Sequence, residues 1–330
     1  IFMETLFVSS LNANLALAWV IYIVLLLRLI FKRISKRLCL FLWLIVGLRC
    51  VLPFSFQSTF SFLPSSQVFD PGDMYGYSFK IHSGLYFIDE YVNDYLGDHY
   101  FEGISVPVET MLKSARNGAV IWVIGMVIMT SLLIAGIVAL KRRLCTAVIY
   151  EGNIWQSDMI GSPFVFGIFR PKIYVPFNLQ GKDFSLVIAH EREHIKHGDH
   201  LWKFLFYLIL IINWYNPLMW VAYKKFSDDL EFACDERVIG KKNEYERKAY
   251  AMTLLNYAAR TPLFFAERLY FGCEKIRDRI ESIIDYKDRN RFLIAVFVLI
   301  LFIVACGVLA DPDPNADNNL LDILQRRGVK

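Results

Sequence analysis

The chain alternates long apolar runs with short basic segments, a pattern typical of proteins that cross a membrane. The runs from about Leu6 to Phe31, from Ala119 to Leu140 and from Phe292 to Ala310 are long enough to span the hydrocarbon, which takes roughly 20 helical residues. The run from Leu38 to Phe54 is shorter and has Arg49 near one end, where its charged group can reach the interface. We predict that it also spans, which gives about four transmembrane helices.

Composition supports a membrane protein. Hydrophobic residues make up 55% of the chain, and 27 of its 330 residues are Phe, far above the usage of soluble domains. The mean hydropathy is positive, at +0.38.

Basic residues are unevenly distributed between the apolar runs, and this asymmetry predicts an orientation. Seven of them flank the runs near residues 31–38 and 140: Lys32, Arg33, Lys36, Arg37, Lys141, Arg142 and Arg143. Residues 55–117 instead contain eight acidic residues and only three Lys or Arg. Because Lys and Arg favour the cytoplasmic side, we expect the N-terminus and residues 55–117 to lie outside and residues 141–290 in the cytoplasm. No basic residue precedes the first run, which argues against a cleaved signal peptide.

His190-Glu191-Arg192-Glu193-His194 has the spacing of a zinc site with a catalytic base. Positions i and i+4 of a helix share one face, so His190 and His194 can bind the same cation. Glu191 lies between them, where its carboxylate can take a proton from water that the metal activates. Catalytic zinc takes three protein ligands and leaves its fourth position open, so a third ligand is needed.

The segment 229–235 supplies an acidic pair at helical spacing for this purpose. We predict Glu231 as the third zinc ligand and Asp235, one turn later, as the group that orients a ligating imidazole. The alternative third ligand is His200, ten residues after His190, where a metzincin places its third histidine. That family also needs a glycine at the position of His197, so Glu231 is preferred.

The residues that follow His194 carry less information. Asp199 and His197 are open to a role behind the ligands or toward a substrate, but we interpret both as ordinary polar residues at a helix end. Glu193, although inside the motif, is interpreted as a solvated charge.

The apolar run from Leu201 to Tyr223 lies between the two halves of the proposed zinc site. A single membrane crossing there would separate the halves, so we expect a non-crossing segment. Asn213, Asn216 and Pro217 interrupt the run, as in a bent or hairpin-like helix buried in protein or dipping into the bilayer. The alternative is an ordinary fifth spanning helix, which would be incompatible with the zinc site.

Two further segments predict local structure. Residues 162–176 are punctuated by Gly and Pro and predict β-structure at a sheet edge, which either pairs with an extended substrate or supports the zinc helix. Ile276, Ile280, Ile283 and Ile284 predict an amphipathic helix that packs on the catalytic domain. The preceding residues 261–272 are expected to form an irregular apolar loop.

These features together resemble the M56 peptidases, the membrane zinc-peptidase family of the β-lactam sensor-transducers of Gram-positive bacteria. The resemblance rests on the Ser-Pro-Phe…Pro-Lys-Ile-Tyr-Val-Pro strand at 162–176, His190-Glu191…His194, the Asn213-Trp214-Tyr215-Asn216-Pro217 bend and Glu231…Ala233-Cys234-Asp235. It implies a mainly α membrane protein with a cytoplasmic α+β gluzincin domain. It also implies one Zn²⁺ bound by His190, His194 and Glu231, with Glu191 as general base.

The resemblance further implies a function. Signalling in this family ends in proteolysis of a cytoplasmic transcriptional repressor, often with self-cleavage between the zinc domain and the last span. We therefore expect a bacterial cell-membrane metalloendopeptidase whose partners are the lipid bilayer and a DNA-binding repressor. No direct nucleic-acid binding is expected, and a homodimer is compatible with the sequence. The self-cleavage region would lie around Tyr270, Phe271, Gly272 and Cys273.

The expected organisation is two spans in 1–54, an outer loop in 55–117, a third span in 118–140, the zinc domain in 141–290, a fourth span in 291–310 and a short outer tail in 311–330. The antibiotic-sensing family members carry an outer penicillin-binding domain with a Ser-x-x-Lys nucleophile, a motif that this chain lacks. The chain therefore either senses something else, through the acidic residues 55–117, or is a fragment of a longer receptor.

Two other functions remain open. An M48-type quality-control protease shares HExxH and the Glu-x-x-x-Asp helix but cuts many unfolded proteins. A non-catalytic receptor or scaffold would use the metal structurally and close its fourth position with a protein ligand. Cys234 and His197 are the nearby candidates for that ligand, and neither has an obvious spacing.

Overall fold

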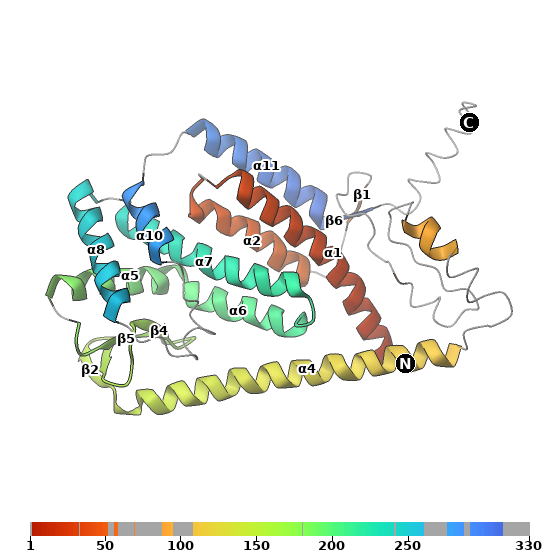
Figure 1. Ribbon diagram of the computed structural model, residues 1–330, viewed down its shortest axis with the longest axis horizontal. Coiled ribbons are helices and arrows are strands. Elements are labelled where there is room, and N and C mark those ends of the chain that lie inside the picture. The colour runs from red at the N-terminus through yellow and green to blue at the C-terminus, as the bar shows by residue number, and fades with distance from the viewer. Residues whose placement is uncertain are drawn as a thin grey trace.

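The computed structural model describes residues 2–32, 34–51, 56–58, 69, 88–94, 108–179, 181–240, 242–260, 276–286 and 291–312. Helices dominate these residues, and two small sheets accompany them (Figure 1). The helices are α1 (Phe2–Ile30), α2 (Lys36–Val51), α4 (Val108–Arg143), α5 (Gly181–His197), α6 (Asp199–Ile212), α7 (Pro217–Ile239), α8 (Glu244–Arg260), α10 (Ile276–Ile284) and α11 (Arg291–Leu309). The predicted self-cleavage residues 270–273 lie outside the described residues.

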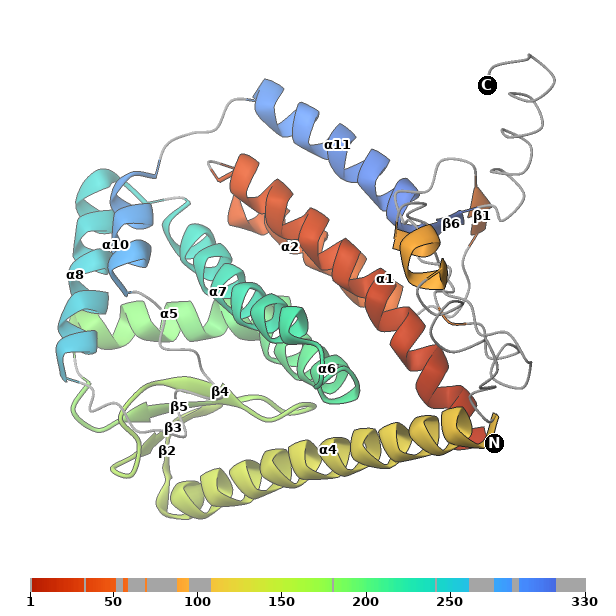
Figure 2. The same ribbon diagram turned by 45° about the vertical axis from the view of Figure 1, so that its right-hand side comes forward.

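Helices α1, α2, α6, α7 and α11 form a bundle, while α4 runs along its side to the sheet (Figure 2). Their facing sides build one apolar core because each helix contributes fully buried side chains. Representatives from the five helices are Ile21, Trp43, Leu210, Met219 and Phe297.

Three helices are long and apolar enough to cross a membrane: Phe2–Ile30, Leu112–Thr146 and Arg291–Leu309. Helix α4, with 36 residues, begins well before the expected third span. At 1.5 Å per residue it extends about 54 Å, beyond a hydrocarbon layer of about 30 Å. Helix α2 has 16 residues and packs against α1, α7 and α11, so the span predicted over Leu38–Phe54, and with it the count of four spans, is not confirmed.

The apolar run after the zinc motif forms a helical hairpin. Helices α6 and α7 pack against each other, and the chain reverses between Ile212 and Pro217. Asn216 caps α7 because its side-chain oxygen accepts a hydrogen bond from the Leu218 amide at 3.0 Å, and Pro217 occupies the first turn. The bend follows from the Asn and Pro residues that indicated it, and its relation to a bilayer stays a prediction.

Polar side chains fix the tip of this hairpin to α1. Asn14 donates to the side-chain oxygen of Asn213 and to the Tyr215 hydroxyl, both at 2.6 Å, and accepts from Asn216 at 3.1 Å. The polar residues of the bend therefore attach the hairpin to α1, because buried amide groups need hydrogen-bond partners and the hairpin tip supplies them.

The tip also contacts α4 through tryptophans. The Trp214 indole donates to the Trp122 carbonyl at 3.1 Å, and the Trp122 indole donates to the Ile212 carbonyl at 2.9 Å. A Cβ atom at Gly125 would lie 2.0 Å from the Trp214 ring, so a glycine is required there.

A four-stranded sheet in the order β2-β3-β5-β4 lies beside α5: β2 (Val148–Glu151), β3 (Ile154–Ser157), β4 (Phe164–Phe166) and β5 (Lys172–Pro176). Strands β3 and β5 are parallel, and the other pairs are antiparallel. Ile173 and Val175 of the sheet pack against Val187 and Ile188 of α5. The expected edge strand is β4, whereas β5 is an inner strand that ends at its proline.

The amphipathic helix expected after residue 275 is α10, which packs on α8 and α7. Its Ile283 is buried with Ile239 and Tyr250.

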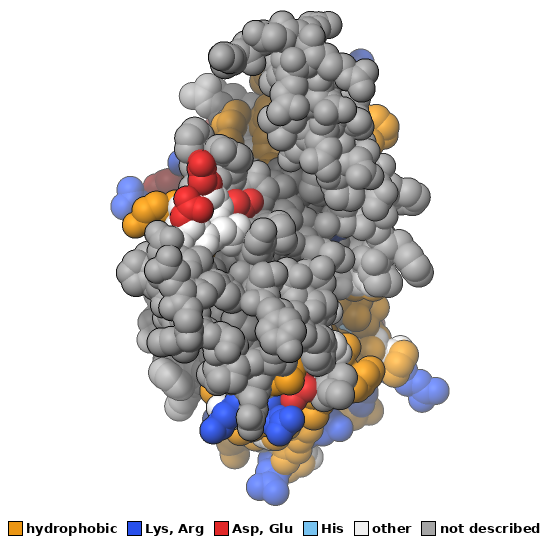
Figure 3. Space-filling view, turned by 90° about the vertical axis from the view of Figure 1, so that its right-hand side faces the viewer, with side chains coloured by type: hydrophobic (Ala, Val, Ile, Leu, Met, Phe, Trp, Pro, Cys, Tyr) orange, Lys and Arg blue, Asp and Glu red, His pale blue; other side chains and the backbone are white. Residues whose placement is uncertain are grey.

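At the opposite end of the molecule, β1 (Phe56–Ser58) pairs in parallel with β6 (Ala310–Pro312). A helix over residues 88–94, which contains Asp89, Glu90 and Asp94, lies at this end, and acidic side chains gather on the face of the molecule seen in Figure 3.

A buried ion pair joins α7 to the first two helices. Arg28 of α1 donates two hydrogen bonds to the Asp229 carboxylate, at 2.8 and 2.9 Å, and the Trp43 indole of α2 donates a third at 2.8 Å. The Asp229 side chain is fully buried. Three donors satisfy this carboxylate, so it fixes the position of the helix that carries Glu231.

Replacing Asp229 by Ala should therefore destabilise the protein by about 3–5 kcal/mol, because Arg28 would remain buried without its partner. Asp228→Ala is the matched control, since Asp228 is half-buried and its ion pair among the described residues is with a partly exposed Lys225, and it should cost less than about 1 kcal/mol. The free energy of unfolding of the detergent-purified protein measures both. Equal losses would contradict the role of the pair.

Candidate metal centre

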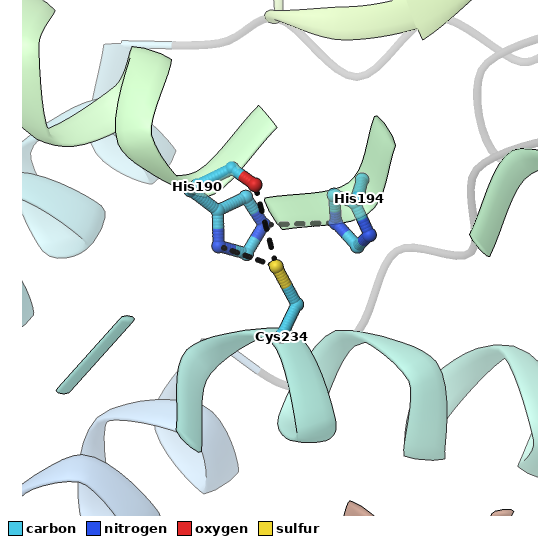
Figure 4. Close-up of side chains that lie close together, drawn as sticks. All are labelled: His190, His194 and Cys234. Carbon is cyan, nitrogen blue, oxygen red and sulfur yellow. Dashed lines mark hydrogen bonds between the residues drawn. The ribbon is translucent and has the colours of Figure 1, made fainter. Parts of the chain in front are cut away.

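Helix α5 brings the two motif histidines together. His190 and His194 project from the same face one turn apart, and their Nε2 atoms lie 3.1 Å from each other (Figure 4). The helix packs on the sheet on one side and on α7 on the other, so both imidazoles are largely buried.

Glu231 of α7 completes a triangle of ligand atoms. Its Oε2 atom lies 3.6 Å from His190 Nε2 and 3.5 Å from His194 Nε2. Two ligands at 2.0–2.1 Å from a tetrahedral zinc ion are about 3.3–3.4 Å apart, which matches these separations. The donor set therefore fits a zinc ion.

Two cations hold the Glu231 carboxylate. Lys203 of α6 donates to Oε1 at 3.0 Å, and the Arg279 guanidinium of α10 lies 3.6 Å from Oε2. Burial raises the pKa of Glu231, but the charge of Lys203 and hydrogen bonds with both imidazoles outweigh it and keep the pKa well below its usual value. Glu231 is therefore an anion, as a metal ligand must be.

Asp199 orients His194 from the start of α6. Its Oδ2 atom lies 2.8 Å from His194 Nδ1 and accepts from Arg237 at 3.0 Å. Gly198 has a φ of +67°, and this left-handed turn begins α6 at Asp199. The interpretation of Asp199 as an ordinary helix-end residue is wrong; its spacing from His194 was the available signal. His197 contacts the backbone and carboxylate of Glu193 instead.

His190 is oriented by a group from α8. The Tyr250 hydroxyl lies 2.8 Å from His190 Nδ1 and donates to Asp235 Oδ1 at 2.7 Å. Asp235 Oδ1 itself is 3.4 Å from Nδ1, and Arg279 donates to both Asp235 oxygens at 2.7 Å. Asp235 is thus close to the imidazole as predicted, but a tyrosine stands between them.

Cys234 also lies close to His190, although its spacing in the sequence did not predict this contact. Its Sγ atom lies 3.4 Å from His190 Nδ1 and donates to the His190 carbonyl at 3.4 Å (Figure 4). One ligand atom from each of His190, His194 and Cys234 lies within 4.8 Å of the others. Residues 231, 234 and 235 share one face of α7, since they are three and four positions apart.

The remaining candidates differ in their surroundings. Glu191 is buried and makes no hydrogen bond or ion pair with the described residues. Both ring nitrogens of His200 are buried without a hydrogen-bond partner in the described part of the chain, and the ring lies near the backbone of Ile168 and His194.

The electrostatics of the centre favour positive charge. Burial lowers the pKa of His190, but its neighbours Cys234 and Glu231 favour the protonated ring and raise the pKa to about 10. Burial also lowers the pKa of His194, but Cys234, Glu231 and Asp199 outweigh this effect and raise the pKa well above its usual value. A cation between these groups would take the place of the protons.

Comparison with known proteins agrees with this chemistry. The model of the BlaR1 peptidase M56 family matches residues 8–283, so the chain belongs to this family of membrane metallopeptidases. It is 26% identical to the regulatory protein BlaR1 of Bacillus licheniformis over 162 residues, which cover 47% of this chain and 27% of the relative.

Two staphylococcal relatives are similar. The methicillin resistance mecR1 protein of Staphylococcus aureus is 25% identical over 159 residues, 44% of this chain and 27% of the relative. The regulatory protein BlaR1 of Staphylococcus aureus is 30% identical over 121 residues, 35% of this chain and 21% of the relative. The chain thus spans about a quarter of the length of these relatives.

Proposed function

We propose that this chain is a membrane-embedded zinc metalloendopeptidase that transduces a signal by hydrolysing a cytoplasmic protein. The observation that carries the proposal is the triangle of ligand atoms from His190, His194 and Glu231, with sides of 3.1, 3.5 and 3.6 Å. Three ligands leave one position of a tetrahedral ion open, as in catalytic sites.

The roles of the residues follow from their contacts. When bound, zinc supplies Lewis-acid chemistry: it polarises the scissile carbonyl and lowers the pKa of water. Glu191, which no described partner engages, takes the proton of the attacking water and passes it to the leaving amine. Asp199 holds His194, and Lys203 occupies the second oxygen of Glu231.

The membrane orientation is proposed from charge. Basic residues end α1 and α4 and begin α2, at the end of the bundle that carries the metal centre: Arg28, Lys36, Arg37, Lys141, Arg142 and Arg143. By the positive-inside rule this end is cytoplasmic, which puts the N-terminus and residues 55–117 outside. The centre then meets cytoplasmic substrates.

The substrate class is proposed from the family. The relatives are named a regulatory protein and a methicillin resistance protein, and the family resemblance points to a DNA-binding repressor as substrate. Among the described strands, β4 is the edge strand that α5 contacts, and an extended peptide that added to the sheet there would lie next to the zinc helix. Self-cleavage around residues 270–273 remains a prediction, as does a homodimer.

The alternative is a structural metal site closed by Cys234, which a specific contact favours: its Sγ atom lies near His190. The sulfur faces Nδ1, whereas the triangle uses Nε2, so we prefer Glu231 as third ligand.

Zinc content separates the two ligand sets. The detergent-purified protein should hold one zinc per chain, and Glu231→Ala should lose or greatly weaken it because two ligands remain. Cys234→Ser should keep the zinc, and a hydroxamate should still bind at the open position. Zinc kept in Glu231→Ala but lost in Cys234→Ser would establish the closed structural site instead.

Glu191→Gln tests the catalytic role. Hydrolysis of a fluorogenic peptide library should fall at least about 100-fold while the zinc stays bound, because the amide cannot accept the proton. Glu193→Gln, on the same helix and paired among the described residues with Lys196 and His197, should retain activity. Near-normal activity of Glu191→Gln would exclude the mechanism. Rapid cleavage of denatured casein by the wild type would favour the quality-control alternative over a narrow transducer.

A further inference from the structure

The hydrogen-bond chain that leads away from His190 has a fixed direction. Arg279 donates to both oxygens of Asp235, so this carboxylate is ionised and can only accept hydrogen bonds. The Tyr250 hydroxyl therefore donates its single proton to Asp235, at 2.7 Å. Its oxygen is left to accept a hydrogen bond from His190 Nδ1, at 2.8 Å. With the proton on Nδ1, the lone pair of His190 is on Nε2, the atom that faces Glu231 and His194.

On this geometry, and resting on the proposed zinc site, we propose that Tyr250 is the positioning residue that fixes His190 in its zinc-binding tautomer. Asp235 and Arg279 hold Tyr250 in turn. A zinc-bound histidine usually donates directly to a carboxylate or carbonyl. Here the neutral hydroxyl of Tyr250 lies between His190 and Asp235, and Arg279 neutralises the charge of the Asp235 carboxylate.

The relay makes the metal centre depend on two helices that follow the motif-bearing part of the chain. Tyr250 is on α8 and is 1% exposed, and Arg279 is on α10 with 13% side-chain exposure. The two helices pack against each other through Tyr250, Ala251 and Ile283. Because α10 leads into α11, its docking supplies the arginine and so sets the zinc affinity.

Charge pairing is consistent with this role. Asp199 pairs with Arg237, Glu231 with Lys203, and Asp235 with Arg279. Each of these three carboxylates thus has a cationic partner, and Arg279 also lies 3.6 Å from Glu231. The carboxylates that orient the imidazoles therefore add little net negative charge near the metal. They act by fixing the orientation of the two rings.

The test uses the full chain in detergent, stripped of metal. The zinc dissociation constant is measured by competition with a chromophoric chelator, and the melting temperature of the metal-free protein by its thermal transition. Tyr250→Phe removes one oxygen and leaves the packed ring, and it should weaken zinc binding by about 10- to 100-fold. Tyr245→Phe, on the same helix and 80% exposed, is the control and should leave the affinity unchanged.

Arg279→Met should weaken zinc binding over the same range. Its control is Arg277→Met on the exposed side of α10, where the ion pair of Arg277 among the described residues is with Glu281. The Tyr250→Phe/Arg279→Met double variant should be no weaker than the weaker single variant, because both act through one relay. A purely structural role would lower the melting temperature and give additive effects instead.

The outcomes separate this inference from the proposed function. Unchanged zinc affinity in Tyr250→Phe, with zinc lost in Glu231→Ala, overturns the relay alone. Zinc kept in Glu231→Ala overturns the proposed ligand set, while a weakened Tyr250→Phe would still support the orientation of His190. If Tyr250→Phe does not fold, Arg279→Met decides: affinity equal to that of Arg277→Met overturns the relay.

Discussion

Buried carboxylates on α7 impose the constraint on which the rest of the structure depends. An ionised carboxylate that leaves water must be paired and hydrogen-bonded, or the helix that carries it is strongly destabilised. Three buried carboxylates and the partly buried Glu231 lie on α7, and their partners come from other elements: Asp229 with Arg28 and Trp43, Glu231 with Lys203, Asp235 with Arg279, and Glu236 with Ser35 and Arg37. Helices α1, α2, α6 and α10 are therefore all held to one helix by charge.

This arrangement links the apolar bundle to the metal centre. Asp229 faces α1 and α2, and Glu231, two residues later, faces the histidines of α5. Since a helix is rigid over such a short distance, a displacement of α1 or α2 relative to α7 would move a candidate ligand. The hairpin tip, docked on Asn14 and on Gly125, limits the same displacement at the other end of α7.

The geometry of the candidate metal centre and the family assignment agree for a physical reason. A pair of imidazoles one helical turn apart needs a third ligand from elsewhere in the fold, and α7 brings it to within 3.6 Å. Among the described strands, β4 lies at one edge of the sheet beside α5, and α5 contacts that strand. The triangle of ligand atoms therefore lies beside the strand that the proposed peptide hydrolysis would use to hold an extended substrate.

The sequence by itself determined the features that depend on local spacing. Helical periodicity placed His190 and His194 on one face, the Asn and Pro residues predicted the bend after α6, and isoleucine spacing predicted α10. It did not determine the length of α4 or the short α2, because hydropathy records apolarity rather than where a helix begins and ends. Only the tertiary structure decided which distant polar groups meet: Tyr250 and Arg279 are separated from His190 by 60 and 89 residues, and no periodicity connects them. The spacing of residues in the sequence identifies neighbours along one helix, whereas the packing of helices against each other determines the partners of a buried charge.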